Sequence, residues 1–142
     1  VATTFALQEV EGHINGPEDL AGKRVATIRR SPAADYLALQ GIRARLFEHE
    51  EDAYQALLDD EVDAVVYDAP VLQHYAANEG AGTVETAGLV FQALNYGVAL
   101  PQNSPYREPI NLALLQLIER NEYQQLYEKW FGESGGPATG GP

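Results

Sequence analysis

The sequence predicts an α/β fold in which a mainly parallel sheet is flanked by helices. Short apolar runs typical of buried strands, such as DAVVY at 63–67, alternate with stretches of helical spacing, such as 50–60. Strands and helices that alternate in this way form βαβ units, whose strands run parallel. The chain has 142 residues, of which 45% are hydrophobic, so it is long enough to bury a core.

The expected elements follow one another at the spacing of that fold. A short helical turn in GPEDLAG precedes a strand over 24–28, and Ser31 and Pro32 then suit a helix N-cap and a first helical residue. The remaining elements are a helix over 33–40, a strand over 43–48, a helix over 50–60, a strand over 63–67, a helix over 70–78, strands over 83–91 and 96–100, and a helical region from 105 to about 131 that is broken near Asn121.

Composition excludes several classes of function. The chain carries 9 Lys and Arg against 21 Asp and Glu, a net charge of −12, which argues against nucleic acid and anionic membranes as partners. It contains no Cys, and its three His lack the spacing of metal ligands, so we expect neither a metal site nor a cofactor. No apolar run reaches the roughly 18 residues that a membrane span needs.

The first candidate site is the segment from Arg30 through Ser31 and Pro32 to Ala33. It follows the strand over 24–28, at the edge of a parallel sheet where ligands bind. A helix N-terminus presents unpaired N–H groups and the positive end of the helix dipole, and an arginine adds a guanidinium suited to carboxylates. The same residues also fit an ordinary N-cap beside solvated arginines, and alone they favour that interpretation.

The second candidate is Asp68, which follows the strand over 63–67 and precedes a helix. Its carboxylate can accept a hydrogen bond from an ammonium group at the same edge of the sheet. Asp is also a preferred capping residue, and Pro70 stands two places on, so capping is the alternative interpretation.

Patterns typical of enzymes are sparse. Ser31, His49 and Asp68 have the residue types of a hydrolytic triad, but nothing in the sequence links them, and no GxSxG motif occurs. GPEDLAG lacks both common phosphate-loop patterns. We therefore expect a protein without enzymatic activity.

Several stretches, taken in order, resemble one family. They are GPEDLAGKRVAT, Ser31 at a helix start, DAVVYDAPVLQHYA, NYGVALPQNSPYREPINLALLQLIE and YEKWFG. The series, over roughly residues 14–132, resembles type II periplasmic solute-binding proteins of the polar amino-acid class (family 3). It is closer still to the ligand-binding domains of ionotropic glutamate receptors, especially those of prokaryotic receptor-like channels.

The resemblance implies a fold of two α/β lobes that close on an amino acid. Residues 16–95 would form the second lobe, and 96–132 a return strand and C-terminal helices that normally pack on the first lobe. Residues 1–15 would be a lead-in segment that resembles the chain leaving a pore helix, and 133–142 a disordered tail. The main body of the first lobe, with its carboxylate-binding arginine, would precede this chain.

The resemblance also assigns residues to the ligand. Ser31 aligns with the serine whose amide and hydroxyl hold a ligand carboxylate, and Asp68 with the acid that binds the α-ammonium group. Two positions depart from the pattern: Arg30 replaces a small residue, often Gly, and Pro32 replaces Ser or Thr. Pro32 removes one amide donor, which Arg30 could replace with a charged one.

The expected function is half of an amino-acid-binding domain, for glutamate or a similar ligand, in a receptor-type ion channel outside the cell or in the periplasm. Its partners would be the ligand, the first lobe and the transmembrane portion of the same protein, with a homodimer as a further option. The alternative is a solute-binding protein of a polar amino-acid ABC transporter. A third option is an enzyme of the same fold that resembles cyclohexadienyl dehydratase.

Overall fold

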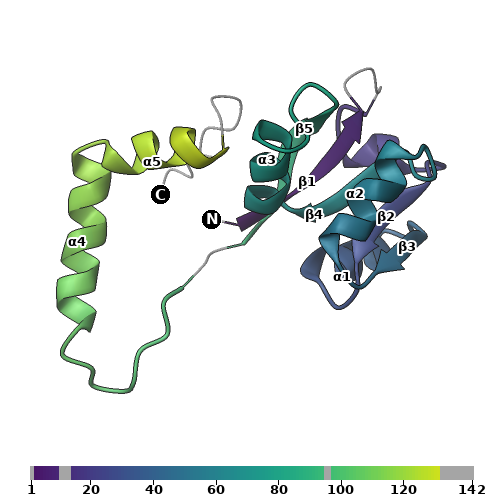
Figure 1. The fold of residues 1–142 in the computed structure, drawn as a ribbon. Coiled ribbons are helices and arrows are strands. Elements are labelled where there is room, and N and C mark those ends of the chain that lie inside the picture. The colour runs from purple at the N-terminus through teal and green to yellow at the C-terminus, as the bar shows by residue number, and fades with distance from the viewer. Residues whose placement is uncertain (1, 10–13, 95–96, 132–142) are drawn as a thin grey trace.

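The computed structural model describes residues 2–9, 14–94 and 97–131 (Figure 1). The strands are β1 (Ala2–Glu9), β2 (Val25–Ile28), β3 (Ala44–Phe47), β4 (Ala64–Asp68) and β5 (Val84–Leu94). The helices are the 3₁₀ turn η1 (Pro17–Leu20), α1 (Pro32–Leu39), α2 (Glu50–Leu58), α3 (Ala69–Ala77), α4 (Arg107–Glu119) and α5 (Glu122–Phe131).

The five strands form one sheet in the order β3-β2-β4-β1-β5. Strand β2 pairs in parallel with β3 and β4, whereas β1 runs antiparallel to both β4 and β5. Four strands therefore point the same way and only β1 opposes them. The predicted α/β class, with a mainly parallel sheet flanked by helices, is confirmed.

The core lies in two layers, one on each face of the sheet. Because successive strand residues point to opposite faces, Val65 packs in one layer while Ala64 and Val66 pack in the other. Helices α2 and α3 cover the first face with Leu57 and Leu72. Helix α1 and the turn η1 cover the second face. There Leu20 of η1 and Ala33 and Leu37 of α1 pack on the strand residues Val25, Ala64 and Val66.

A stacked tyrosine pair joins the two helices on the first face. The rings of Tyr54 on α2 and Tyr75 on α3 lie 3.9 Å apart at 17°. The hydroxyl of Tyr54 is buried and has no hydrogen-bond partner among the described residues. Burial, the main cause, raises the pKa of Tyr54 well above its ordinary value.

Two segments differ from the expected elements. Residues 2–9, within the predicted lead-in, form β1 in the interior of the sheet, where Thr4 pairs with Asp68. Register shifts between Ala2 and Ala6 interrupt its pairing with β5, which weakens the period-two pattern that marks a strand. The expected strand over 96–100 is wrong at residues 97–100, which are irregular and lie beside no strand in the described chain.

Helix α4 lies away from the sheet, at the end of an irregular stretch (Figure 1). The break predicted near Asn121 is confirmed, since Asn121 has φ +59° between α4 and α5. Helix α5 returns to the lobe, where the Tyr127 hydroxyl donates to Gln73 Oε1 (2.7 Å) on α3. Tyr96 and the predicted tail at 133–142 lie outside the described residues.

Candidate functional site

Two strand ends bring the sequence-predicted residues to one edge of the sheet. Strands β2 and β4 are parallel neighbours in which Thr27 pairs with Val66. The buried Thr27 hydroxyl also donates to the Val66 carbonyl at 2.7 Å, which ties the strands together just before they end. Ser31 follows β2 and Asp68 ends β4, so both lie at the carboxyl edge of the sheet, where α/β proteins bind ligands.

Ser31 is a buried N-cap of α1. Its Oγ accepts a hydrogen bond from the Ala34 N–H at 3.1 Å, as the cap pattern predicts. The hydroxyl proton is donated to the Ile28 carbonyl at 2.7 Å. A serine hydroxyl has one proton to give, so its donor is already committed within the chain.

The first turn of α1 nevertheless keeps a backbone donor. Pro32 is exposed, occupies the first helical position and has no N–H. Ala33 is fully buried, and within the described chain its N–H donates no hydrogen bond. The positive end of the helix dipole adds to this donor, so the turn can hold an anionic group.

Arg30 has an unusual backbone directly before the cap. Its φ is +61°, in the left-handed region that favours glycine. The side chain is 84% exposed, and its guanidinium lies 3.8 Å from Glu48 Oε2. The other oxygen of Glu48 forms an ion pair with Arg29 Nε at 2.7 Å. The sequence pattern does not single out Glu48, although its place directly after β3, the neighbour of β2, could have suggested it.

Asp68 lies at the N-cap position of α3 and is partly exposed. Its carboxylate makes no capping hydrogen bond to that helix. The capping interpretation of Asp68 is therefore not supported, and the carboxylate lies at the carboxyl edge from which Ser31 also emerges. An acceptor carboxylate and a donor helix start on neighbouring strands suit a ligand that carries both an ammonium and a carboxylate group.

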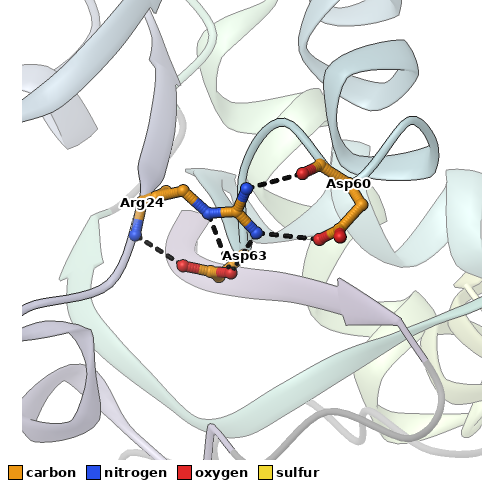
Figure 2. Close-up of polar contacts among 3 residues, drawn as sticks. All are labelled: Arg24, Asp60 and Asp63. Atoms are coloured by element: carbon orange, nitrogen blue, oxygen red, sulfur yellow. Dashed lines mark hydrogen bonds and ion pairs between the residues drawn. The ribbon is translucent and has the colours of Figure 1, made fainter.

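The densest polar cluster lies at the opposite, amino edge of the sheet (Figure 2). Arg24, directly before β2, donates to both oxygens of Asp63: N–H to Oδ2 at 2.7 Å, and Nε and Nη2 to Oδ1 at 3.2 and 2.7 Å. It also donates to the carbonyl and carboxylate of Asp60 at 2.6 and 2.8 Å. These hydrogen bonds hold the pKa of Asp63 below its ordinary value and raise that of Arg24.

Other site types find no support in the described chain. Over residues 2–9, 14–94 and 97–131, no group of His, Asp and Glu could hold a metal ion. His49 is exposed, and the Ser31 hydroxyl donates its proton to the Ile28 carbonyl, so that hydroxyl does not donate to a histidine as in a hydrolytic triad. A search of the same residues finds no helix long and apolar enough to cross a membrane.

A hollow lies between the irregular stretch after β5 and the C-terminal helices. It is lined by the irregular stretch after β5 together with α4 and α5, through Gly97, Val98, Leu100, Pro101, Gln102, Asn103, Ser104, Arg107, Ile110, Asn111, Leu114 and Tyr123. None of the five predicted ligand residues lines it. Ser31 and Asp68 instead lie at an open edge of the lobe.

The fold and sequence of the chain are similar to those of known amino-acid-binding domains. No family model matches the chain. The ligand-binding core of GluR0 from Nostoc punctiforme, solved in complex with L-glutamate, is 48% identical, with a TM-score of 0.72 over 92% of this chain and 61% of that one. An ancestral arginine-binding protein bound to glutamine is 32% identical, with a TM-score of 0.67 over 93% and 60%.

A curated relative extends the similarity to animal receptors. The ionotropic glutamate receptor NMDA 2D of Mus musculus is 39% identical over 82 residues, which are 56% of this chain and 6% of the relative. The chain thus spans about three fifths of the solved structures and a small part of this receptor. The predicted resemblance to glutamate-receptor ligand-binding cores and amino-acid-binding proteins is confirmed.

Proposed function

We propose that this chain is the second lobe, with the C-terminal helices, of an amino-acid-binding domain in a receptor-type ion channel. The observation that carries the proposal is that the α1 N-terminus and Asp68 follow or end two neighbouring parallel strands, and so lie at the same edge of the sheet. The helix start offers the Ala33 N–H and the positive end of its dipole to a carboxylate, and Asp68 offers an acceptor to an ammonium group. The similarity to a core complexed with L-glutamate, over 92% of the chain, supports glutamate or a similar amino acid as the ligand.

The ligand would lie between this lobe and a first lobe. The Ala33 N–H at the start of α1, together with the positive end of the helix dipole, would bind its carboxylate, and Asp68 would bind its α-ammonium group. Closure of the two lobes adds these contacts only in the closed state, so the ligand favours closure by its differential affinity. In a channel, that difference would bias the gate. The site would lie outside the cell or in the periplasm, and the lobe would carry no enzymatic step.

The exposed surface of α4 supports a first lobe as partner. Among its described residues none is buried, and Leu112, Leu115 and Ile118 are 58, 56 and 63% exposed. An apolar helix face of this kind is normally covered by protein. The first lobe of the same protein is the proposed cover, and a second copy of the chain is the alternative.

The test is calorimetric titration of the full-length protein with a panel of L-amino acids that includes L-glutamate. We expect measurable binding, and Asp68→Ala to weaken it by about thirtyfold or more, because the ammonium group loses its charged acceptor. Asp52→Ala, which removes an exposed carboxylate from α2, is the matched control and should leave affinity unchanged. Unchanged affinity in Asp68→Ala would refute the site.

A solute-binding protein of an amino-acid transporter is the second candidate. The similarity to an ancestral cationic amino acid solute-binding protein, at 27% identity and a TM-score of 0.78, favours it. The domain would bind its ligand in the same way in either setting, so affinity does not separate them. Ligand-gated current from the full-length protein in lipid bilayers would support the channel, whereas ligand-dependent stimulation of a transporter ATPase would support the alternative.

A further inference from the structure

We propose that Arg30 selects ligands with an anionic side chain, and that the Glu48 carboxylate pairs with its guanidinium until such a ligand displaces it. The inference rests on the proposed amino-acid-binding function and concerns the specificity of that site. It draws on the order of the strands, the charges after β2 and β3, and the backbone of Arg30.

The order of the strands places Arg30 and Asp68 at different points along the carboxyl edge. Strand β2 lies between β4 and β3, so the residues that follow these strands form a row along the carboxyl edge. Asp68 stands at one end of the row, Ser31 in the middle, and the ion pair of Arg30 with Glu48 at the other end. A ligand whose ammonium group binds Asp68 and whose side chain runs along this row would present the end of that side chain to Arg30.

The charges at that end of the row leave one cation undercompensated. Glu48 is the carboxylate paired with two arginines, and it holds Arg29 at 2.7 Å but Arg30 only at 3.8 Å. Arg30 is thus the loosely held guanidinium of the three-residue group. In a chain of net charge −12, an exposed cation of this kind beside a helix N-terminus is unusual.

Two local features explain why a charged donor stands here. The left-handed φ of +61° favours glycine, yet the position carries an arginine whose 84% exposed side chain gains little from packing. Pro32 meanwhile removes one of the neutral amide donors at the start of α1. The Arg30 guanidinium supplies a stronger donor for a carboxylate, in a planar fork that can bind both oxygens.

The experiment compares L-glutamate with L-glutamine, which differ at the end of the side chain by a carboxylate and an amide of similar size. Both are titrated into the full-length protein by calorimetry. In Arg30→Asn we expect the ratio of glutamate to glutamine affinity to fall roughly tenfold, because a charged hydrogen bond is lost. Asn tolerates the left-handed backbone, so the loop is kept. Arg30→Gly is the second neutral variant and should behave alike.

Matched variants separate the local contact from general charge effects. Arg30→Lys keeps the charge and should keep most of the preference for L-glutamate. Arg43→Gln removes the same charge at an exposed position before β3, at the far edge of the sheet, and should leave the ratio unchanged. In Glu48→Gln the competitor is gone, so affinity for L-glutamate should rise roughly twofold to fivefold while that for L-glutamine does not.

Three outcomes would overturn the inference. In the first, Arg30→Asn and Arg30→Gly leave the affinity ratio as it is. In the second, both ligands are weakened equally, which would make Arg30 part of the loop architecture. In the third, the unaltered protein binds amino acids but not acidic ones, which would sink this inference and leave the proposed function intact. A protein that binds no amino acid would overturn both.

Discussion

The arginines at the two ends of strand β2 differ in how strongly they are bound by other residues of the chain. Before the strand, Arg24 makes five hydrogen bonds to Asp60 and Asp63 (Figure 2). After the strand, the Arg30 guanidinium lies 3.8 Å from the Glu48 carboxylate, which also pairs with Arg29. Both side chains are exposed, Arg24 at 51% and Arg30 at 84%, so the difference lies in their partners more than in burial.

The difference separates a structural role from a binding role. Hydrogen-bonding groups that are satisfied within the chain have little left to offer a ligand, and their removal acts on folding. Groups with spare donors or acceptors contribute little to folding, and their removal acts on binding. The amino edge of the sheet is therefore expected to stabilise the lobe, and the carboxyl edge to recognise the ligand.

Asp63→Asn should give the largest change in stability at the amino edge. The variant loses a carboxylate that accepts three hydrogen bonds from Arg24, and we expect the free energy of unfolding to fall by about 1 to 2 kcal/mol, a value that allows for partial exposure. Urea denaturation measures it. Ligand affinity should not change, and a large loss of affinity would contradict the division between the two edges.

The same variant has a predictable pH dependence. Asp63 has a pKa below its ordinary value of 3.8, mainly through the side-chain hydrogen bonds from Arg24. Its contribution is complete above the ordinary value and is lost as pH falls from there toward the lowered pKa. The stability advantage of the unaltered protein over Asp63→Asn should thus be constant near neutral pH and shrink below about pH 4. An advantage that persists in acid would contradict this cause.

Ser31→Ala tests a residue that lies at the carboxyl edge but whose side chain, like that of Arg24, is already hydrogen-bonded within the chain. The hydroxyl caps α1 and donates to Ile28, so its loss should lower the free energy of unfolding by about 1 kcal/mol. Because its proton is already engaged, ligand affinity should change less than stability does. Ser31→Thr keeps the hydroxyl and serves as the control. Strong loss of affinity at unchanged stability would show that the hydroxyl turns toward the ligand instead.

Much of the fold could be predicted because its signals are local. The Ser31 and Pro32 pair sets the start of α1, and Asn121 separates α4 from α5. The neighbourhood of Ser31 and Asp68 followed from one general rule, that parallel strands end at a common edge. Strand β1 was harder to find, since the register shifts near Thr4 interrupt the alternation that marks a strand.

The contacts that distinguish the two edges depend on long-range pairing. Arg24 meets Asp63 across 39 residues, because β2 and β4 are neighbours in the sheet. Glu48 meets Arg30 because β3 is the other neighbour of β2. The sequence shows each charge but not which strands lie side by side, so the role of Glu48 became visible only in the structure.

Arg30→Gly is expected to give the smallest change, and in the opposite direction. A non-glycine residue in left-handed backbone destabilises the folded state by about 1 to 2 kcal/mol, and glycine removes this strain. Glycine also makes the unfolded chain more flexible, which lowers the free energy of unfolding by about 0.4 to 1 kcal/mol and offsets part of the gain. The ion pair at 3.8 Å is exposed and adds little. The variant should therefore be more stable by about 0.5 kcal/mol, measured by urea denaturation without ligand.

Arg29→Gly is the matched control for that variant. Arg29 has no left-handed φ and makes the shorter ion pair with Glu48, so glycine there should lower stability. A fall in stability at both positions would mean that the backbone of Arg30 carries no strain. A gain in stability for Arg30→Gly but not for Arg29→Gly, combined with a loss of preference for L-glutamate, would show that Arg30 lowers the stability of the fold. That is expected of a residue that contributes to ligand binding.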